Sequence, residues 1–291
     1  MLFLAAIIWG LAFVAQSAGM DYVGPFTFNF SRYIVGSLVL VPIVLTVSRK
    51  QMKVRQMSTR KTILSGIGCG LILFVASTFQ QIGIARTDSV GKAGFITALY
   101  IVLVPVIGLA FGKKCKILIA LSVVIATVGL YLLCVKDGMS LDKADILLML
   151  CAIAFSFHIL FIDYVSENTD GVAVSCIQFA VSGICSLICA LFTEKIDLHG
   201  ILNAYLPILY AGVCSCGIAY TFQILGQKYV EPSKASLIMC LESVFSALGG
   251  FLILNQKMSI RELVGCVVVF AAIILAQFTG VKEEKEETNK S

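Results

Sequence analysis

Long apolar stretches separated by short polar interruptions run along the whole chain. The strands of a membrane β-barrel alternate polar and apolar positions over about 10 residues, whereas these stretches are continuous and therefore indicate helices. A helix needs about 20 mostly apolar residues to cross a membrane. The pattern predicts an all-α polytopic membrane protein with ten transmembrane helices, at residues 2–19, 25–48, 62–84, 94–111, 117–135, 145–165, 172–193, 204–226, 236–254 and 262–280.

The composition excludes several classes of protein. Of the 291 residues, 59% are hydrophobic and 13% are charged, whereas soluble domains carry about 25% charged residues. A soluble enzyme, a disordered protein and a nucleic-acid binder are excluded, although the net charge is +5. Most of the 11 cysteines lie inside apolar stretches and none forms a CxxC pair. Buried thiols are therefore expected, and no metal site or cofactor is predicted.

Lysine and arginine residues predict the orientation of the helices. If the N-terminus is cytoplasmic, 14 of the 22 cations lie in cytoplasmic loops or the C-terminal tail, seven lie outside, and Arg32 lies within a span. Cytoplasmic loops of membrane proteins are enriched in these residues. We therefore expect a multi-pass protein of the cell membrane with both termini in the cytoplasm.

The two halves of the chain resemble each other. At an offset of 142 residues, identical residues coincide: Gln81 with Gln223, Lys92 with Lys234, Ala93 with Ala235 and Leu99 with Leu241. Because each half has an odd number of spans, the second copy enters the membrane in the opposite sense, an architecture that recurs in secondary transporters. The predicted organisation is two inverted five-helix repeats and a charged cytoplasmic tail, at residues 1–135, 136–280 and 281–291.

Ionisable side chains inside a span mark candidate functional sites, since each costs at least ~2.5–3.5 kcal/mol to insert. Glu242 lies in the ninth span, toward its cytoplasmic end, and shares a helical face with Ile238 and Phe245. This face is expected to point into the helix bundle. Glu242 is then either a contact for a substrate amine or a proton carrier, or it is a buried carboxylate that holds helices together by hydrogen bonds.

For Arg32 and His158, a functional and a structural interpretation both remain open. Arg32 lies about two turns into the second span. A guanidinium there either binds a carboxylate or phosphate of a substrate, or extends outward to the membrane interface or bonds helix-end carbonyls. His158 lies near the middle of the sixth span. It is either a proton relay or a neutral packing residue held by a hydrogen bond.

Uncharged polar and aromatic residues extend the candidate substrate or coupling site. Trp9 shares one face of the first span with Phe13 and Gln16. Gln81 and Gln223 occupy corresponding positions of the third and eighth spans. Tyr100 corresponds to Glu242 at the offset of 142 residues. If the repeats face each other, these residues approach one cavity from opposite sides. The alternative for Trp9 and Tyr100 is packing in the core of the bundle.

Proline and glycine residues indicate where the helices bend or pack closely. Pro105 lies within the fourth span, where it removes one backbone hydrogen bond and is expected to kink the helix. The kink is either a gate or a static bend. Gly66 and Gly70, and likewise Gly108 and Gly112, are four residues apart, a spacing that favours close packing between helices.

These residues resemble the drug/metabolite transporter superfamily, specifically its EamA-type members. The resemblance covers residues 1–280. It rests on Trp9-Gly10 with Phe13, on Pro25 followed by Arg32, on the stretch KAGFITALYIVLVPVIG from Lys92 to Gly108, and on LESVF from Leu241 to Phe245. The resemblance implies ten helices in two inverted repeats, a central cavity, and movement of small metabolites, often outward.

Two departures from the family pattern concern helix bending and helix-end charge. The family usually has Glu-Pro within the last of these motifs, where this chain has Glu242-Ser243. It usually has Gly-Glu at the end of the fourth span and of its counterpart, where this chain has Gly112-Lys113 and Asn255-Gln256. These differences affect the expected details of gating and leave the expected fold unchanged.

The sequence predicts a secondary transporter that moves a small amino-acid-like or amphipathic metabolite across the lipid bilayer by alternating access, with export as the expected direction. No nucleotide-binding GxxxxGK[ST] loop occurs, so proton coupling or facilitated diffusion is expected rather than ATP drive. Two alternatives are an importer or exchanger of phosphorylated or nucleotide-linked sugars, and a non-transporting membrane sensor or scaffold. An intramembrane enzyme is not expected, because the chain has neither an HExxH motif nor paired aspartates in facing helices.

Overall fold

The structure is a computed structural model that describes residues 1–48, 50, 58–87, 90–113, 115–134, 142–166, 169–253 and 259–288. Within these ranges every regular element is a helix and no strand is present. The prediction of an all-α protein is confirmed.

The helices follow one another with short connections. The first half holds α1 (Leu2–Gly19), α2 (Pro25–Ile43), the π-helical η1 (Val44–Ser48), α4 (Thr59–Ile84), α5 (Val90–Ala98), α6 (Tyr100–Ala110) and α7 (Ile117–Cys134). The second half holds α8 (Lys143–Ser166), α9 (Gly171–Thr193), α10 (Leu198–Asn203), α11 (Tyr205–Leu209), the π-helical η2 (Tyr210–Tyr220), α12 (Thr221–Gln227), α13 (Pro232–Met239), α14 (Leu241–Ile253) and α15 (Ile260–Thr288).

Eight helical spans within the described residues are long and apolar enough to cross a membrane. Four of them are composite: α2 continues into η1, α5 continues into α6, α11 continues through η2 into α12, and α13 continues into α14. A ninth apolar helix, at Ile117–Leu133, is shorter. The predicted tenth span lies within α15, which continues into the charged tail. The protein is thus a multi-pass helical membrane protein, and the count of ten spans stays a prediction.

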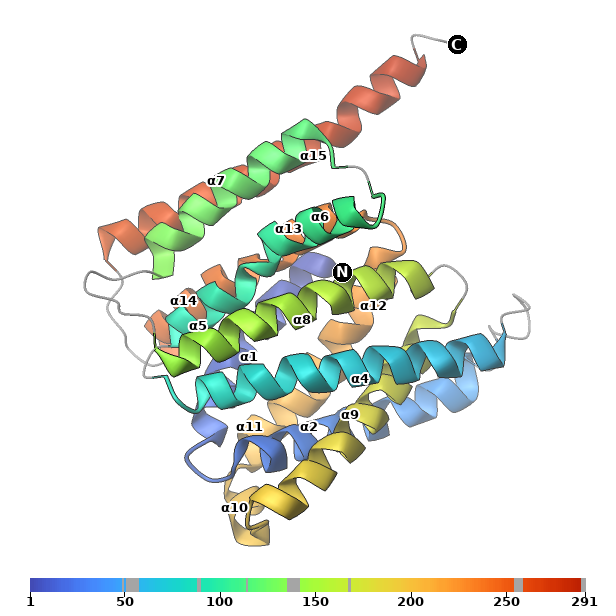
Figure 1. Cartoon of the computed structure of the whole chain (residues 1–291), viewed down its shortest axis with the longest axis vertical. Coiled ribbons are helices and arrows are strands. Elements are labelled where there is room, and N and C mark those ends of the chain that lie inside the picture. Colours follow the sequence, from blue (N-terminus) through green and yellow to red (C-terminus); the bar gives the residue numbers. More distant parts are fainter. Residues whose placement is uncertain are drawn as a thin grey trace.

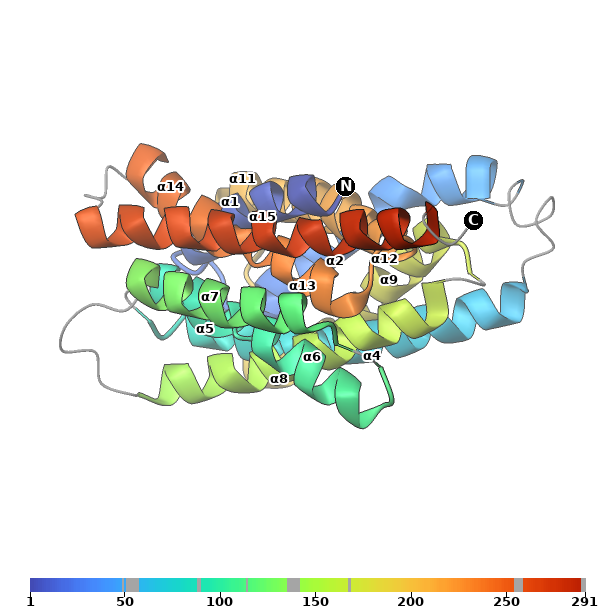
Figure 2. The same ribbon diagram turned by 90° about the horizontal axis from the view of Figure 1, so that it is seen from above.

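The two halves pack against each other in a reciprocal way. Figure 1 shows α7 and α15 side by side along one edge and α2 and α9 toward the opposite edge, and Figure 2 shows α7 and α15 together in the perpendicular view. Each pair joins helices at corresponding places in the halves. In addition, the contact of α4 with α8 has its counterpart in the contact of η2 with α1. The contact of α14 with α1 likewise has its counterpart in the contacts of α5 and α6 with α8. A two-fold axis between the halves predicts this reciprocity.

Of the two glycine pairs expected to pack helices closely, only one does so. A Cβ atom added at Gly66 or Gly70 would overlap Ile177 or Val181 of α9, so this pair brings α4 close to α9. Gly112 has a φ of +76° and nothing within 4 Å of an added Cβ. It follows the end of α6 in the left-handed conformation typical of a helix C-terminus. The expected packing role of Gly112 is therefore wrong.

The crossing of α7 and α15 offers a test of this packing. A Cβ atom added at Gly265 would lie 2.5 Å from the backbone nitrogen of Leu133 and 2.7 Å from the backbone oxygen of Gly129. Gly265→Leu is therefore expected to push α15 away from α7 and to lower the free energy of unfolding by about 1–3 kcal/mol. Thermal unfolding in detergent measures the effect. Val267→Leu, at an exposed position of α15, is the matched control, and equal melting temperatures of the two variants would contradict the close crossing.

Candidate functional site

A cavity lies between the two halves of the protein. The cavity is narrow, with a volume of about 40 Å³. Its wall comes from α1, α2, α4, α5 and α6 of the first half and from α8, η2, α12, α13 and α14 of the second. Five of the predicted site residues line it: Trp9, Arg32, Tyr100, Gln223 and Glu242. Residues from distant parts of the chain thus meet in one place.

Two helices that form the cavity wall are broken near their middle. The fourth predicted span is interrupted at Leu99, between α5 and α6, and the ninth is interrupted at Cys240, between α13 and α14. Pro105 lies inside α6, well beyond the first break. Ala247 takes the corresponding place in α14. The break in the second half therefore forms without a proline at the equivalent position, and the role of Pro105 as a gate or a static bend stays a prediction.

Tyr100 and Glu242 meet where the two broken helices come together. Each lies close after a break and about half-way along its span, so Glu242 is more central than the sequence predicted. The hydroxyl of Tyr100 donates a hydrogen bond of 3.0 Å to Oε1 of Glu242. The bond joins the halves through two residues that correspond at the offset of 142.

The position of Glu242 in the fold offsets part of the desolvation cost of burying its carboxylate. The side chain is buried in the cavity wall and forms no ion pair with any cation that the structure describes. It lies in the first turn of α14, where the helix dipole favours a negative charge. One hydrogen bond and a helix terminus therefore support a carboxylate that still faces the cavity.

Arg32 is a buried cation without a carboxylate partner among the described residues. Its Nη1 donates to Oε1 of Gln16 at 2.8 Å, and its Nη2 donates to the hydroxyl of Tyr33 at 3.2 Å. The guanidinium also lies over the Tyr33 ring, 4.8 Å from its centre. Arg32 does not extend outward to the membrane interface. It contributes an uncompensated positive charge to the cavity wall.

Two predicted site residues lie behind the wall of the cavity. Nε2 of His158 is 3.1 Å from Oε1 of Gln178, and the imidazole packs edge-on against Tyr220 at 6.1 Å between ring centres. Gln81 donates from Nε2 to the backbone oxygen of Gln16 at 3.2 Å. Because Tyr220 and Gln16 line the cavity, His158 and Gln81 contact wall residues rather than the open space.

Some wall residues are not evident from the sequence. Tyr220 packs against Trp9 with ring centres 4.7 Å apart, and Gln80 occupies the place in the wall that was expected for Gln81. The internal repeat carries a signal for Tyr220, because its counterpart at the offset of 142 is Thr78, one turn from Gln81. No comparable signal distinguishes the neighbours Gln80 and Gln81.

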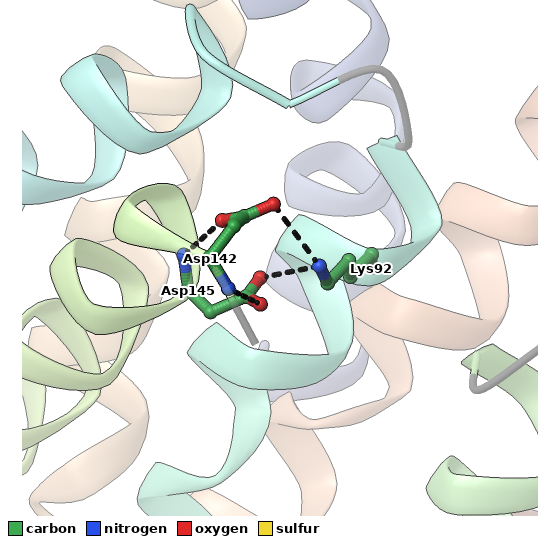
Figure 3. Close-up of polar contacts among 3 residues, drawn as sticks. All are labelled: Lys92, Asp142 and Asp145. Carbon is green, nitrogen blue, oxygen red and sulfur yellow. Dashed lines mark hydrogen bonds and ion pairs between the residues drawn. The ribbon is translucent and has the colours of Figure 1, made fainter. Parts of the chain in front are cut away.

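A cluster of charged residues lies at the start of α8 (Figure 3). Nζ of Lys92 is 2.8 Å from Oδ1 of Asp145 and 3.4 Å from Oδ2 of Asp142. Each aspartate also accepts the backbone N–H of the other, at 2.9 and 3.0 Å, an arrangement that caps the first turn of the helix. Lys92, predicted to lie in an outside loop, is instead buried against α8.

The charged cluster keeps Asp142 ionised. The pKa of Asp142 lies below its usual value of 3.8, because its carboxylate accepts the backbone N–H of Asp145 and lies beside Lys92. A carboxylate whose pKa is lowered by folding contributes stability that is complete above the unfolded value and is lost as the pH falls through the folded value. Asp142 is therefore fully charged at neutral pH.

The fold and the cavity define the class of the protein. A bundle of apolar spanning helices around a central cavity built from both halves is typical of membrane transporters. The sequence profile of the EamA-like transporter family matches the chain over residues 1–135 and again over residues 142–278. The chain belongs to this family, which is part of the drug/metabolite transporter superfamily, and the predicted resemblance is confirmed.

The names of similar proteins agree with this assignment, and a solved structure shares the fold. An "Uncharacterized transporter" of Archaeoglobus fulgidus is 27% identical over 94% of this chain and 83% of its own length. The "Uncharacterized transporter YoaV" of Bacillus subtilis is 21% identical over 94% of each chain. A "WAT1-related protein" of Arabidopsis thaliana, marked chloroplastic, is 22% identical over 93% of this chain and 67% of its own length. A solved structure titled "Crystal structure of protein" shares the fold, with a TM-score of 0.78, 16% identity and 97% coverage of both chains.

The stability of Arg32→Met distinguishes a structural from a functional role of the cation. A buried cation without an anionic partner has a desolvation cost that an apolar side chain of similar size lacks. We expect the free energy of unfolding of Arg32→Met to stay within about 1 kcal/mol of the parent protein or to rise. Thermal unfolding in detergent measures the difference.

Gln16→Leu is the matched control for Arg32→Met. It removes an acceptor from the guanidinium and is expected to lower the free energy of unfolding by about 1–3 kcal/mol. A loss as large as this in Arg32→Met itself would assign Arg32 a structural role.

Proposed function

We propose that this chain is a secondary transporter of the cell membrane that exports a small amino-acid-like or amphipathic metabolite by alternating access. The observation that carries the proposal is the hydrogen bond between Tyr100 and Glu242, because it joins the two halves in the wall of the cavity. A solute that binds Glu242 competes for this bond. Solute binding is thereby coupled to the contact between the halves, and alternating access requires such a coupling.

The charges of the cavity favour a zwitterionic solute. Arg32 and Glu242 both line the cavity, and no ion pair joins them. A guanidinium suits a carboxylate group, and the carboxylate of Glu242 suits an ammonium group. The rings of Trp9 and Tyr220 offer an aromatic surface for an apolar side chain. An amino acid carries these three parts on one small molecule.

The alternatives have less support. A phosphorylated or nucleotide-linked sugar would need several cations, whereas Arg32 is the one cationic side chain among the described residues that line the cavity. A sensor or scaffold without transport does not account for a family whose relatives carry the name of transporters.

Two inverted five-helix repeats, at residues 1–135 and 136–280, account for several observations together. The family profile matches the two parts separately, and the contacts between the halves are reciprocal. Tyr100 and Glu242, equivalent at the offset of 142, contact each other, as residues near a two-fold axis do. In this arrangement α7 and α15 are the fifth and tenth spans, and residues 281–291 form a charged tail.

Orientation and coupling complete the proposal. The distribution of lysine and arginine supports both termini in the cytoplasm. Outward transport rests on the behaviour implied by the family resemblance. Glu242 is the proposed proton carrier, because it is the carboxylate in the cavity wall.

Glu242→Gln tests the role of this carboxylate in transport. Solutes are chosen by metabolite profiling of cells that lack or overproduce the protein, and their transport is then measured in proteoliposomes. We expect transport to fall by at least about tenfold, as the loss of one charge-assisted hydrogen bond predicts. If Glu242 carries a proton, substrate addition should also move protons in the parent protein and not in the variant.

Glu231→Gln, at an exposed position before α13, is the matched control and should transport normally. Transport by Glu242→Gln at the parent rate would remove Glu242 from the site.

Labelling of introduced cysteines tests the orientation. Arg60→Cys lies at the exposed start of α4, and Lys195→Cys lies at an exposed position between α9 and α10. We expect an impermeant maleimide to label Lys195→Cys in intact cells and Arg60→Cys only after permeabilisation, each compared with the unmodified protein. The opposite result would invert the topology.

A further inference from the structure

The cavity has two ends that correspond to each other at the offset of 142 residues. We call them the Lys92 end and the Lys234 end, after the lysines at equivalent positions there. In alternating access, each end closes in turn as the halves exchange their conformations. If the halves were identical in sequence, the two closed states would have the same free energy. Residues that differ between the ends therefore decide which state is populated at rest.

Large apolar side chains close the Lys92 end. The cluster lies along α5 between the cavity residue Thr97 and Lys92 and also draws on α1, α4 and α8. We call its five residues the apolar gate: Phe13, Ile84, Ala93, Ile96 and Leu148. Phe13 also lines the cavity, so the gate lies directly against the cavity.

At the Lys234 end, two of the five equivalent positions carry smaller side chains and three carry the same residue. In the same order, the counterparts of the five gate residues are Phe155, Gly226, Ala235, Ile238 and Ala6. Phe155 lines the cavity just as Phe13 does. Gly226 and Ala6, however, stand in place of isoleucine and leucine. Closure of the Lys234 end by the equivalent movement therefore buries less apolar surface than closure of the Lys92 end. The free energy gained on closure is smaller in proportion to this difference in area.

A buried ion pair reinforces the Lys92 end, whereas the ion pair described at the Lys234 end, between Lys113 and Asp163, is more exposed, at 53% and 16%. In the pair of Lys92 and Asp145, the side chains are 9% and 0% exposed (Figure 3). Separating α5 from α8 leaves each buried charge without its partner. At the Lys234 end, the counterpart of Asp145 is Phe3. Lys234 itself forms no ion pair within the part of the chain that the structure describes.

Free space lies beyond the cavity at the Lys234 end. A hollow of about 400 Å³ is lined there by residues that include Asp163, Gln227 and Pro232. Gln227 is one helical turn beyond the cavity residue Gln223, and Asp163 is one turn beyond the cavity residue Ile159. The hollow therefore lies next to the cavity, on the side opposite to the apolar gate.

We propose that the apolar gate and the Lys92–Asp145 ion pair close the Lys92 end more firmly than their counterparts close the Lys234 end, so that the resting protein is closed at the Lys92 end. Lys92, Asp145 and Leu148 are then gating residues. With the expected orientation, the Lys92 end faces outside, and the resting transporter receives its solute from the cytoplasm. The inference rests on the alternating access proposed above.

A cysteine in the cavity tests which end is open. Thr97 lines the cavity beside the gate and is 1% exposed, so Thr97→Cys reports access to the cavity. An impermeant maleimide is applied to right-side-out and to inside-out vesicles, and the labelling rate above that of the unmodified protein is measured. We expect labelling to be at least about tenfold faster from the face of the Lys234 end. Equal or faster labelling from the face of the Lys92 end would overturn the proposal.

Gate variants in the Thr97→Cys protein test the residues themselves. Lys92→Met should raise the labelling rate from the face of the Lys92 end by about tenfold, the change that one net charge-assisted hydrogen bond gives. Leu148→Ala should raise the rate by about tenfold or more, because truncation of a buried leucine leaves a cavity in the gate. Lys92→Arg keeps the charge, and Lys234→Met removes the equivalent lysine, so both should leave the rate unchanged.

Folding of each variant is checked by its melting temperature and elution in detergent. Leu148→Val is the milder substitution if Leu148→Ala does not fold. The proposal is wrong if folded Lys92→Met and a folded Leu148 variant both label at the parent rate.

The labelling experiment separates this inference from the proposed function, since it measures access without a known solute. Unequal labelling in a protein that transports no solute supports the unequal gates and contradicts the proposed function. Transport together with equal labelling from both faces contradicts the unequal gates alone.

Discussion

The cost of placing polar groups inside an apolar bundle is the constraint on which the rest of this structure depends. Glu242 is buried because Tyr100 donates a hydrogen bond to it and because α14 begins beside it. Arg32 is buried because Gln16 and Tyr33 accept its hydrogen bonds. Most of these bonds join different helices. The interactions that compensate for desolvation therefore also determine how the helices meet around the cavity.

The two halves contact each other through corresponding helices and residues. Contacts between the halves are reciprocal, and Tyr100 bonds Glu242, the residue that corresponds to it at the offset of 142. Two breaks at nearly equivalent places, Leu99 and Cys240, bring the starts of α6 and α14 into the cavity wall. Corresponding positions of the two halves lie at opposite ends of the cavity in the proposed arrangement. A pair of corresponding residues that differ in size or charge therefore makes the two ends of the cavity unequal.

Sequence patterns predicted which kinds of side chain form the site better than they predicted which neighbouring side chain faces the cavity. Arg32 and Glu242 were predictable, because an ionisable group in an apolar span is rare and costly. The places of Gln80 and Gln81 were not, because neighbours on a helix differ by about 100° in direction and only packing decides which faces the cavity. His158 lies behind Tyr220 for the same reason. The burial and ion pairs of Lys92 were not predictable, because its partners, Asp142 and Asp145, are distant along the chain.

The sequence by itself determined that the chain is a helical membrane protein, that its halves resemble each other and that it resembles a transporter family. These properties follow from local composition, from periodicity and from motifs, which need no knowledge of distant contacts. Only the tertiary structure decided that Tyr100 bonds Glu242, that Arg32 is buried without a carboxylate partner among the described residues, and that Lys92 pairs with Asp145. Each of these contacts joins helices far apart along the chain or depends on burial between them, and such partners are chosen by packing and desolvation, which the linear sequence does not display.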